Sequence, residues 1–305
     1  MAVLLHLASG ARHHLWMEHL VGRSRRCALR LDDGLVSSKH ALLRWVDEQW
    51  VLRDLGSRNG TFLESQALRP GEQRALRVGD VIAFGRRDDP WRLDSDDPPV
   101  PMATPEDGGA PVFADSELLT LPDCDAPALV VLRDGEGRWI KERGDEVAPA
   151  VDQELVAIAG RVWRLHLPTS VDITAAPELV ATIDAIAVRF VVSRDEEEVR
   201  VVVRWGAREH DLGVYAHHYT LLTLARLRIR DQVERGLPRD AQGWVHADEL
   251  TRMLRIDDNK LNVDIWRARR HLAQVGVRRA GGLIERRTQR RLLRIGVEQL
   301  EVAIV

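Results

Sequence analysis

Residues 54–62 of this 305-residue chain read Asp-Leu-Gly-Ser-Arg-Asn-Gly-Thr-Phe, and this stretch decides the fold of the N-terminal part. It follows a short apolar run and is rich in the residue types that favour turns. Residues 22–23 (Gly-Arg) and 36–40 (Val-Ser-Ser-Lys-His) stand in the same position after earlier apolar runs, and an apolar run at 76–85 completes the series. Because binding groups usually lie on loops that a rigid β scaffold positions, the pattern predicts short strands with functional loops.

The polar clusters carry donors for an anion. They contain two guanidinium groups, two hydroxyls and one side-chain amide, from Arg23, Arg58, Ser37, Ser38 and Asn59. The set contains no pairing of a nucleophile with a base. A phosphothreonine carries about −1.5 to −2 charge and three strong acceptor oxygens, which this set of donors complements. The clusters therefore predict a phosphate receptor. The alternative is that they are solvated turn residues.

Taken together, the motifs Gly-Arg, Ser-x-x-His and Ser-x-Asn-Gly-Thr resemble the forkhead-associated (FHA) domain, a β-sandwich that binds phosphothreonine peptides. The resemblance covers residues 1–95. It implies that Arg23 and Ser37 hold the phosphate. It further implies that Ser38 positions the peptide, that Arg58 reaches the edge of the phosphate and that Asn59 hydrogen-bonds the peptide backbone.

The same resemblance implies structural roles for a second set of residues that brace the loops: Gly22, His40, Gly60 and Thr61. One departure from the family is visible. Where the family often has Asn-Gly after the strand that follows Asn-Gly-Thr, this chain has Glu64-Ser65. We expect this change to alter the loop and the peptide selectivity, and not the capture of phosphate.

Composition indicates two or three globular domains, since hydrophobic residues make up 45% and charged residues 30% of the chain. No apolar run is long enough to span a membrane. The first ten residues have no basic leader and are expected to form a strand. Two cysteines, Cys27 and Cys124, without metal-binding spacing suit a reduced, cytoplasmic protein.

Catalysis finds little support in the sequence. The eleven histidines are scattered, and adjacent pairs such as His217-His218 would point in opposite directions on a strand. There is no His-x-x-x-His, no glycine-rich phosphate loop and no Cys-x-x-Cys. We therefore expect no enzyme activity, no cofactor and no metal site.

The net charge of −3 hides a strong asymmetry along the chain. Residues 1–95 hold 15 Lys and Arg against 12 Asp and Glu, residues 96–187 hold 6 against 18, and residues 188–305 hold 23 against 17. Residues 260–294 alone hold 11 basic residues against 2 acidic ones. This distribution suggests an anionic partner for the C-terminal part.

Two segments follow the predicted sandwich. Residues 96–111 are rich in Pro and Asp with little that is apolar, which predicts a semi-extended linker. Residues 112–170 predict a small β module. In it, residues 128–139 echo 41–50, and residues 156–165 echo 81–93, while every polar cluster is lost. The module is therefore interpreted as a degenerate, partial FHA fold, with chance similarity as the alternative.

Residues 187–305 predict an α+β domain. Two β runs at 187–193 and 198–205 precede expected helices at 219–235, 248–254 and 259–274. The last helix has apolar residues at steps of four, three, four and three, which is typical of a buried face. Runs at 283–286 and 292–295 predict a closing hairpin. This order is similar to the winged helix-turn-helix output domain of OmpR-type response regulators.

That resemblance implies that the third helix and the hairpin contact DNA. A basic helix beside a basic hairpin suits a major groove and its phosphates. The implied DNA-binding residues are Asn259, Lys260, Arg267 and Arg270 on the helix, and Arg286, Arg287, Arg290 and Arg291 on the wing. Arg267, in mid-helix, is the candidate for reading a base. The glycine-rich wing of the family is replaced here by residues 287–291 (Arg-Thr-Gln-Arg-Arg), and a solvated basic face or a protein-binding winged helix stays open as an alternative.

The sequence therefore predicts a multidomain regulator with an all-β FHA sandwich, a small β module and a winged helix. Its expected partners are a phosphothreonine-containing protein, either a Ser/Thr kinase or its substrate, and duplex DNA. The alternative is a signalling adaptor in which both domains bind proteins and DNA is not bound.

Overall fold

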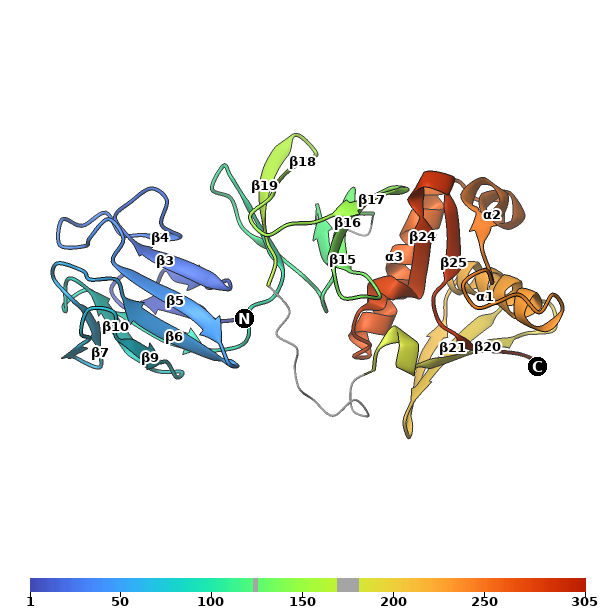
Figure 1. Ribbon diagram of the computed structural model, residues 1–305, viewed down its shortest axis with the longest axis horizontal. Coiled ribbons are helices and arrows are strands. Elements are labelled where there is room, and N and C mark those ends of the chain that lie inside the picture. The colour runs from blue at the N-terminus through green and yellow to red at the C-terminus, as the bar shows by residue number, and fades with distance from the viewer. Residues whose placement is uncertain (123–125, 169–180) are drawn as a thin grey trace. The chain divides into compact units, whose positions relative to one another are not determined.

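The computed structural model describes residues 1–122, 126–168 and 181–305 (Figure 1). The chain divides into two compact units. The first consists of residues 1–100 with a short segment that begins at residue 166, and the second consists of residues 101–165 with the C-terminal part. Each unit is described by itself.

The first unit is a sandwich of two sheets, drawn in blue and teal in Figure 1. One sheet has the order β2-β1-β11-β10-β7-β8 and the other β4-β3-β5-β6-β9. Its strands are β1 (Val3–His6), β2 (Arg12–His14), β3 (Glu18–Gly22), β4 (Leu29–Arg30), β5 (Ala41–Val46), β6 (Gln49–Asp54), β7 (Thr61–Leu63), β8 (Gln66–Ala67), β9 (Gln73–Ala75), β10 (Val81–Phe84) and β11 (Trp91–Ser95). Alternate residues point inward, as Trp50, Leu52 and Asp54 do in β6, because side chains on a strand alternate between its two faces. The architecture agrees with the predicted sandwich.

Two histidines with lowered pKa values, the half-buried His13 and the buried His19, predict that the first unit is sensitive to acid. Burial, and then the neighbouring His14, lowers the pKa of His13 to about 4. Burial, and then His13, places the pKa of His19 well below its ordinary value. The unfolded chain therefore binds more protons below pH 6.5, so the stability is fully present above that pH and is lost as the pH falls towards 4, at up to about 1.4 kcal/mol per pH unit for each histidine.

We expect the unfolding transition of the first unit, followed in the full-length protein, to have a lower midpoint temperature at pH 5.0 than at pH 7.5. A variant with His13→Gln and His19→Gln should lose less on acidification, because it lacks these two protonation sites. A parent whose transitions are the same at the two pH values would contradict the expectation.

The middle part of the chain repeats the strand order of the first unit. Its strands are β12 (Met102–Pro105), β13 (Val112–Phe113), β14 (Leu119–Leu121), β15 (Leu129–Arg133), β16 (Trp139–Arg143), β17 (Glu146–Pro149), β18 (Leu155–Ile158) and β19 (Arg161–His166). They form two sheets with the orders β13-β12-β19-β18 and β14-β15-β16-β17. These orders match β2-β1-β11-β10 and β3-β5-β6-β9 of the first unit. We call residues 101–165 the middle module.

The hairpin registers are also the same. Ile82 pairs with Trp91 in the first unit, and Val156 pairs with Trp163 in the middle module. The sheet orders of the described residues include no counterpart of β4, β7 or β8. The repeat favours the interpretation of a degenerate, partial copy of the same fold.

The linker predicted for residues 96–111 is wrong in its second half. Residues 102–105 form β12, which lies between β13 and β19, and Met102 and Ala103 are buried. The prolines do not prevent this, because they stand outside the strand or at its end, where a missing N–H is tolerated. The middle module therefore begins near Pro101 and not at residue 112.

The C-terminal segment, residues 181–305, combines a sheet, three α-helices and a hairpin. Its elements are η2 (Ile183–Ala185), β20 (Ala187–Val192), β21 (Val199–Trp205), β22 (Arg208–Val214), α1 (His218–Val233), β23 (Val245–His246), α2 (Ala247–Leu254), α3 (Asp258–Gln274), η3 (Ala280–Leu283), β24 (Ile284–Arg287), η4 (Thr288–Arg290), β25 (Leu292–Ile295) and β26 (Gln299–Ile304). The predicted helices and β runs are present within two residues of their expected ends. Strands β22 and β26 were not predicted, and β26 runs parallel to β20.

Helix α3 begins where its capping residue stands. The Asp257 carboxylate accepts a hydrogen bond of 2.7 Å from the backbone N–H of Lys260, which satisfies one of the free donors at the helix start. Leu261, Ile265 and Leu272 lie on the predicted buried face. Among the described residues, no helix has the length and apolar character that crossing a bilayer requires.

The middle module and the C-terminal segment share one hydrophobic core. Leu118, Val130 and Leu132 of the module belong to the same buried cluster as Leu222 of α1 and Ile265 of α3. The module therefore does not form a separate domain with its own core. Its packing against the C-terminal segment decides which side chains of α3 reach solvent.

Candidate functional site

Three loops of the first unit are tied together at Ser37. The backbone N–H of Arg23, just after β3, donates to the Ser37 carbonyl oxygen at 3.0 Å. The backbone N–H of Arg58 donates to the Ser37 hydroxyl oxygen at 3.0 Å. The motifs that are 14 and 21 residues from Ser37 in the sequence are thus brought side by side, because strands β3, β5 and β6 are neighbours in one sheet.

A buried histidine fixes this arrangement. The backbone N–H of Ser37 donates to His40 Nδ1 at 3.0 Å, so the proton lies on His40 Nε2, which donates to the carbonyl oxygen of Gly60 at 3.0 Å. Burial lowers the pKa of His40, which keeps the ring neutral. Gly22 is required nearby, because a Cβ there would lie 2.5 Å from the Ser38 carbonyl oxygen.

Asp54 holds the loop that carries Arg58 and Asn59. Its carboxylate accepts bonds from the backbone N–H of Gly56 (2.8 Å), the hydroxyl of Ser57 (2.6 Å) and the hydroxyl of Thr61 (2.7 Å). Burial raises the pKa of Asp54, but these hydrogen bonds outweigh burial and the net pKa is lowered. Sequence reasoning gave Asp54 no role. The signal was present, since Asp followed by turn residues commonly forms a local hydrogen-bonded turn.

The residues predicted to contact the phosphopeptide lie around the hydrogen bonds made by Ser37, His40 and Asp54. Arg23, Ser38 and Arg58 are exposed, and Ser37 is half-buried. Asn59 is partly committed, since its side-chain amide donates to the Leu35 carbonyl oxygen at 2.8 Å. The result is a set of hydrogen-bonded loops with the guanidinium groups of Arg23 and Arg58 beside them. Such an arrangement is suited to a doubly charged anion on a short side chain.

The departure at Glu64-Ser65 keeps a tight turn between β7 and β8. Both residues have left-handed backbone conformations, with φ of 47° and 66°. Turns of this kind favour Asn-Gly, so the two side chains cost some backbone strain. The Glu64 carboxylate accepts from the backbone N–H of Val81 at 2.7 Å, which anchors the turn to β10.

Comparison with known proteins identifies the domain. Residues 19–85 match the family model of the FHA domain. The chain is 42% identical over 57 residues to an FHA domain-containing protein of Arabidopsis thaliana, which is 19% of this chain and 15% of that protein. It is 36% identical over 64 residues to the FHA domain-containing protein FhaB of Mycobacterium tuberculosis, which is 20% of this chain and 41% of FhaB.

Among solved structures, EmbR of Mycobacterium tuberculosis in complex with a low-affinity phosphopeptide is similar, with 27% identity, a TM-score of 0.29, and coverage of 32% of this chain and 24% of EmbR. The chain thus spans less than half the length of each of these relatives. The predicted FHA domain near the N-terminus is confirmed. FHA domain homologues bind phosphothreonine peptides in signalling.

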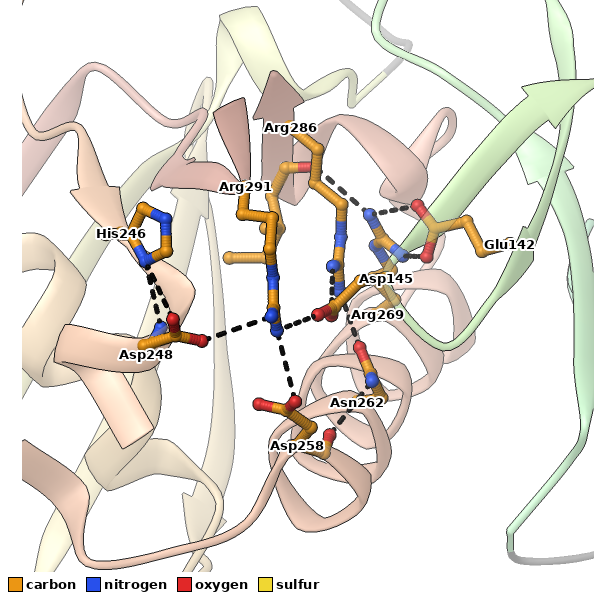
Figure 2. A network of polar contacts seen from close by, with 10 residues as sticks. Glu142, Asp145, His246, Asp248, Asp258, Asn262, Arg269, Arg286 and Arg291 are labelled. Atoms are coloured by element: carbon orange, nitrogen blue, oxygen red, sulfur yellow. Dashed lines mark hydrogen bonds and ion pairs between the residues drawn. The ribbon is translucent and has the colours of Figure 1, made fainter. Parts of the chain in front are cut away.

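A second polar site lies where the middle module meets α3 (Figure 2). Arg269 of α3 is buried and its guanidinium binds both carboxylate oxygens of Glu142 of β16, at 2.6 and 3.1 Å. Arg269 also donates to the carbonyl oxygens of Gly281 and Ile284. Burial raises the pKa of Glu142, but Arg269 and then Arg286 more than compensate, so the net pKa is lowered and the carboxylate stays ionised. Sequence reasoning did not single out Arg269 or Glu142, which are 127 residues apart.

The same interface engages three of the predicted DNA-binding arginines. Asp145 of the module accepts from Arg286 at 3.1 Å and from Arg291 at 2.6 Å. Both contacts are drawn in Figure 2. Asp115 accepts from Arg270 at 3.1 Å. The prediction that Arg286 faces DNA does not hold in this arrangement, because only 7% of its side chain is exposed. Arg270 and Arg291 are partly exposed but already face carboxylates.

The remaining predicted DNA-binding residues, Asn259, Lys260, Arg267, Arg287 and Arg290, are exposed. Asn259 lines a small cavity between α3 and the module. Lys260 forms an ion pair with Asp264, four residues on. Arg287 lies over the Trp244 ring, with its guanidinium carbon 4.1 Å from the ring centroid. The basic surface is therefore divided between a part that the module covers and a part that is open.

The cysteine and metal predictions come out differently. Cys27 is a free, buried thiol whose sulfur donates to the Ser38 carbonyl oxygen at 3.2 Å, and Cys124 lies outside the described residues. The expectation of no metal site rested on the scattered positions of the histidines. The structure gathers three of them, His217, His218 and His271, in the C-terminal segment.

Proposed function

We propose that the protein is a phosphothreonine-dependent regulator that binds phosphorylated partners through its FHA domain and DNA through its C-terminal segment. The observation that supports the first half is the hydrogen-bonded frame at Ser37, with Arg23 and Arg58 beside it. The FHA match over residues 19–85 supports the same half. The partner is a phosphothreonine-containing protein, either a Ser/Thr kinase or its substrate. No catalytic activity is proposed.

The C-terminal segment, in this proposal, is a winged helix. Helices α1, α2 and α3 are followed by the β24–β25 hairpin, which is the order of that fold. Arg267 is exposed in the middle of α3, and Arg287 and Arg290 are exposed on the hairpin. Phosphate neutralisation by such groups supplies most of the non-specific affinity for DNA.

The middle module, in this proposal, limits DNA binding by competing for arginines. Its carboxylates occupy the guanidinium groups of Arg269, Arg270, Arg286 and Arg291. A carboxylate competes with a DNA phosphate for the N–H donors of the same guanidinium. Docking of a phosphorylated partner on the FHA domain would then regulate DNA binding by changing these ion pairs between the module and the C-terminal segment.

The alternative is an adaptor in which the C-terminal segment binds only protein. One observation favours it: Asn262, Trp266 and Arg269 of α3 line a small cavity together with residues of the middle module, and Arg269 binds Glu142 of that module. If the module always stays packed against α3, the helix cannot enter a major groove. The two proposals therefore predict different effects on DNA affinity when the carboxylates of the module that face arginines are removed.

A variant with Asp115→Asn and Asp145→Asn is expected to bind duplex DNA more tightly than the parent. The change removes the carboxylates of the module from Arg270 and Arg291, while Arg291 keeps its ion pairs with Asp248 and Asp258 of its own segment. Each arginine that gains a phosphate contact steepens the slope of log K against log salt concentration by about one. Fluorescence anisotropy with labelled genomic fragments at 50 and 200 mM salt measures both the affinity and the slope.

The matched control is Glu136→Gln with Asp152→Asn, which removes the same charge from exposed positions elsewhere on the module. It should leave the affinity near that of the parent. Equal affinities for the parent and the Asp115→Asn, Asp145→Asn variant, at both salt concentrations, would favour the adaptor.

A further inference from the structure

Three histidines meet where the start of α1 lies against the last turns of α3. His217 immediately precedes α1, His218 is its first residue, and His271 lies near the end of α3. One ring nitrogen from each lies within 4.8 Å of the others. Among the residues that the structure describes, no cysteine or carboxylate joins this group.

Two of the rings are buried and His271 is half-buried, and each of the three has a buried nitrogen that makes no hydrogen bond. His217 and His218 are 5% and 0% exposed. Within the described part of the chain, His217 Nε2, His218 Nε2 and His271 Nδ1 have no hydrogen-bond partner. A buried polar atom without a partner costs about 1–3 kcal/mol, so three such atoms at one point need an explanation.

A hydrogen bond to the backbone assigns the tautomer of one ring of the cluster, His218. His218 Nδ1–H donates to the Val199 carbonyl oxygen at 3.2 Å, which leaves the lone pair on Nε2. A backbone carbonyl bound to the other ring nitrogen is the arrangement that orients histidines at metal sites. The Tyr215 ring packs against all three imidazoles, with centroid distances of 5.3, 5.4 and 4.6 Å, and shields them on one side.

The protonation state agrees with this arrangement. Burial, and then the neighbouring His218, lowers the pKa of His217 to about 3. Burial lowers the pKa of His218 to about 4. At neutral pH the rings are therefore neutral imidazoles, the form that binds metals.

We propose that His217, His218 and His271 form a binding site for a divalent transition metal, with Zn²⁺ as the preferred ion. Imidazole nitrogens suit Zn²⁺, Cu²⁺ and Ni²⁺, and three protein ligands leave the fourth position to water. With Zn–N distances of 2.0–2.1 Å, tetrahedral ligands lie about 3.4 Å apart, so small side-chain rotations close the site from the present separation. A bound ion would fasten the start of α1 to α3, the helix that carries Arg267.

Metal binding by the full-length protein, without a histidine tag and treated with a chelator, tests the proposal. Titration with Zn²⁺ against a chelating dye should show one tight equivalent, and Zn²⁺ should raise the temperature of one unfolding transition. Co²⁺ in place of Zn²⁺ should give the visible absorption of a four-coordinate site with nitrogen and oxygen ligands, and this readout needs no variant.

His271→Ala and, separately, His217→Asn should weaken Zn²⁺ binding by about 100-fold or more, since even the outer partners of metal ligands contribute about 10–100-fold. The control is His210→Gln, which removes an imidazole of the same segment outside the cluster; there the affinity should equal that of the parent. The proposal would be overturned if the parent showed no saturable binding of Zn²⁺. It would also be overturned if folded His271→Ala and His217→Asn proteins bound Zn²⁺ with the affinity of the parent, because the ion would then bind elsewhere.

Discussion

Arg23→Ala is expected to weaken the binding of a phosphothreonine peptide by about 100-fold or more, while the β-sandwich stays folded. A hydrogen bond to a charged group contributes roughly 1.5–3 kcal/mol, so two guanidinium bonds to the phosphate correspond to at least about 3 kcal/mol, or a factor of about 100. The fold is expected to persist because the Arg23 side chain is exposed and only its backbone N–H belongs to the frame around Ser37. Isothermal titration with a peptide selected from a phosphothreonine library measures the effect.

Arg25→Ala is the matched control, since it removes an exposed arginine from the same loop. Its affinity should fall at most a few-fold, from the loss of general attraction. A phosphoserine version of the peptide should bind more weakly to the parent if the threonine methyl is recognised. Equal affinities of the parent and Arg23→Ala would remove the phosphate role from this loop.

Glu142→Ala is expected to destabilise the unit formed by the middle module and the C-terminal segment by about 3–5 kcal/mol. The change leaves the buried Arg269 guanidinium without its carboxylate, and an uncompensated buried charge costs this much. The two remaining carbonyl acceptors, of Gly281 and Ile284, do not replace a negative charge. Urea unfolding followed by circular dichroism, with the transition of this unit compared between variant and parent, gives the free energy.

Two further proteins complete this test. Glu136→Ala removes an exposed carboxylate of the same module and should change the free energy of unfolding by less than about 0.5 kcal/mol. Replacing both partners, with Glu142→Leu and Arg269→Met, should recover much of the lost stability, because apolar groups of similar volume often substitute for a buried pair. A Glu142→Ala protein as stable as the parent would mean that the module does not hold Arg269 in solution.

The FHA domain and the meeting of its three loops at Ser37 could be predicted from the sequence, for a physical reason. Arg23, Ser37 and Arg58 stand at the ends of short apolar runs, and strand ends in one sheet bring neighbouring loops together. The same local logic located α1, α2 and α3, since a helical period of apolar residues acts over a few residues. Strands β22 and β26 escaped prediction because their exposed residues dilute the alternating pattern.

The sequence by itself therefore determined the sandwich, the positions of its polar loops and the basic character of α3 and the hairpin, because each depends on neighbours along the chain. Only the tertiary structure decided which of those basic groups reach solvent. Glu142 and Arg269 are separated by 127 residues, and nothing local to either indicates that they meet. The meeting of His217 and His218 with His271 depends in the same way on how α1 packs against α3, which is a property of the shared core and not of any one segment.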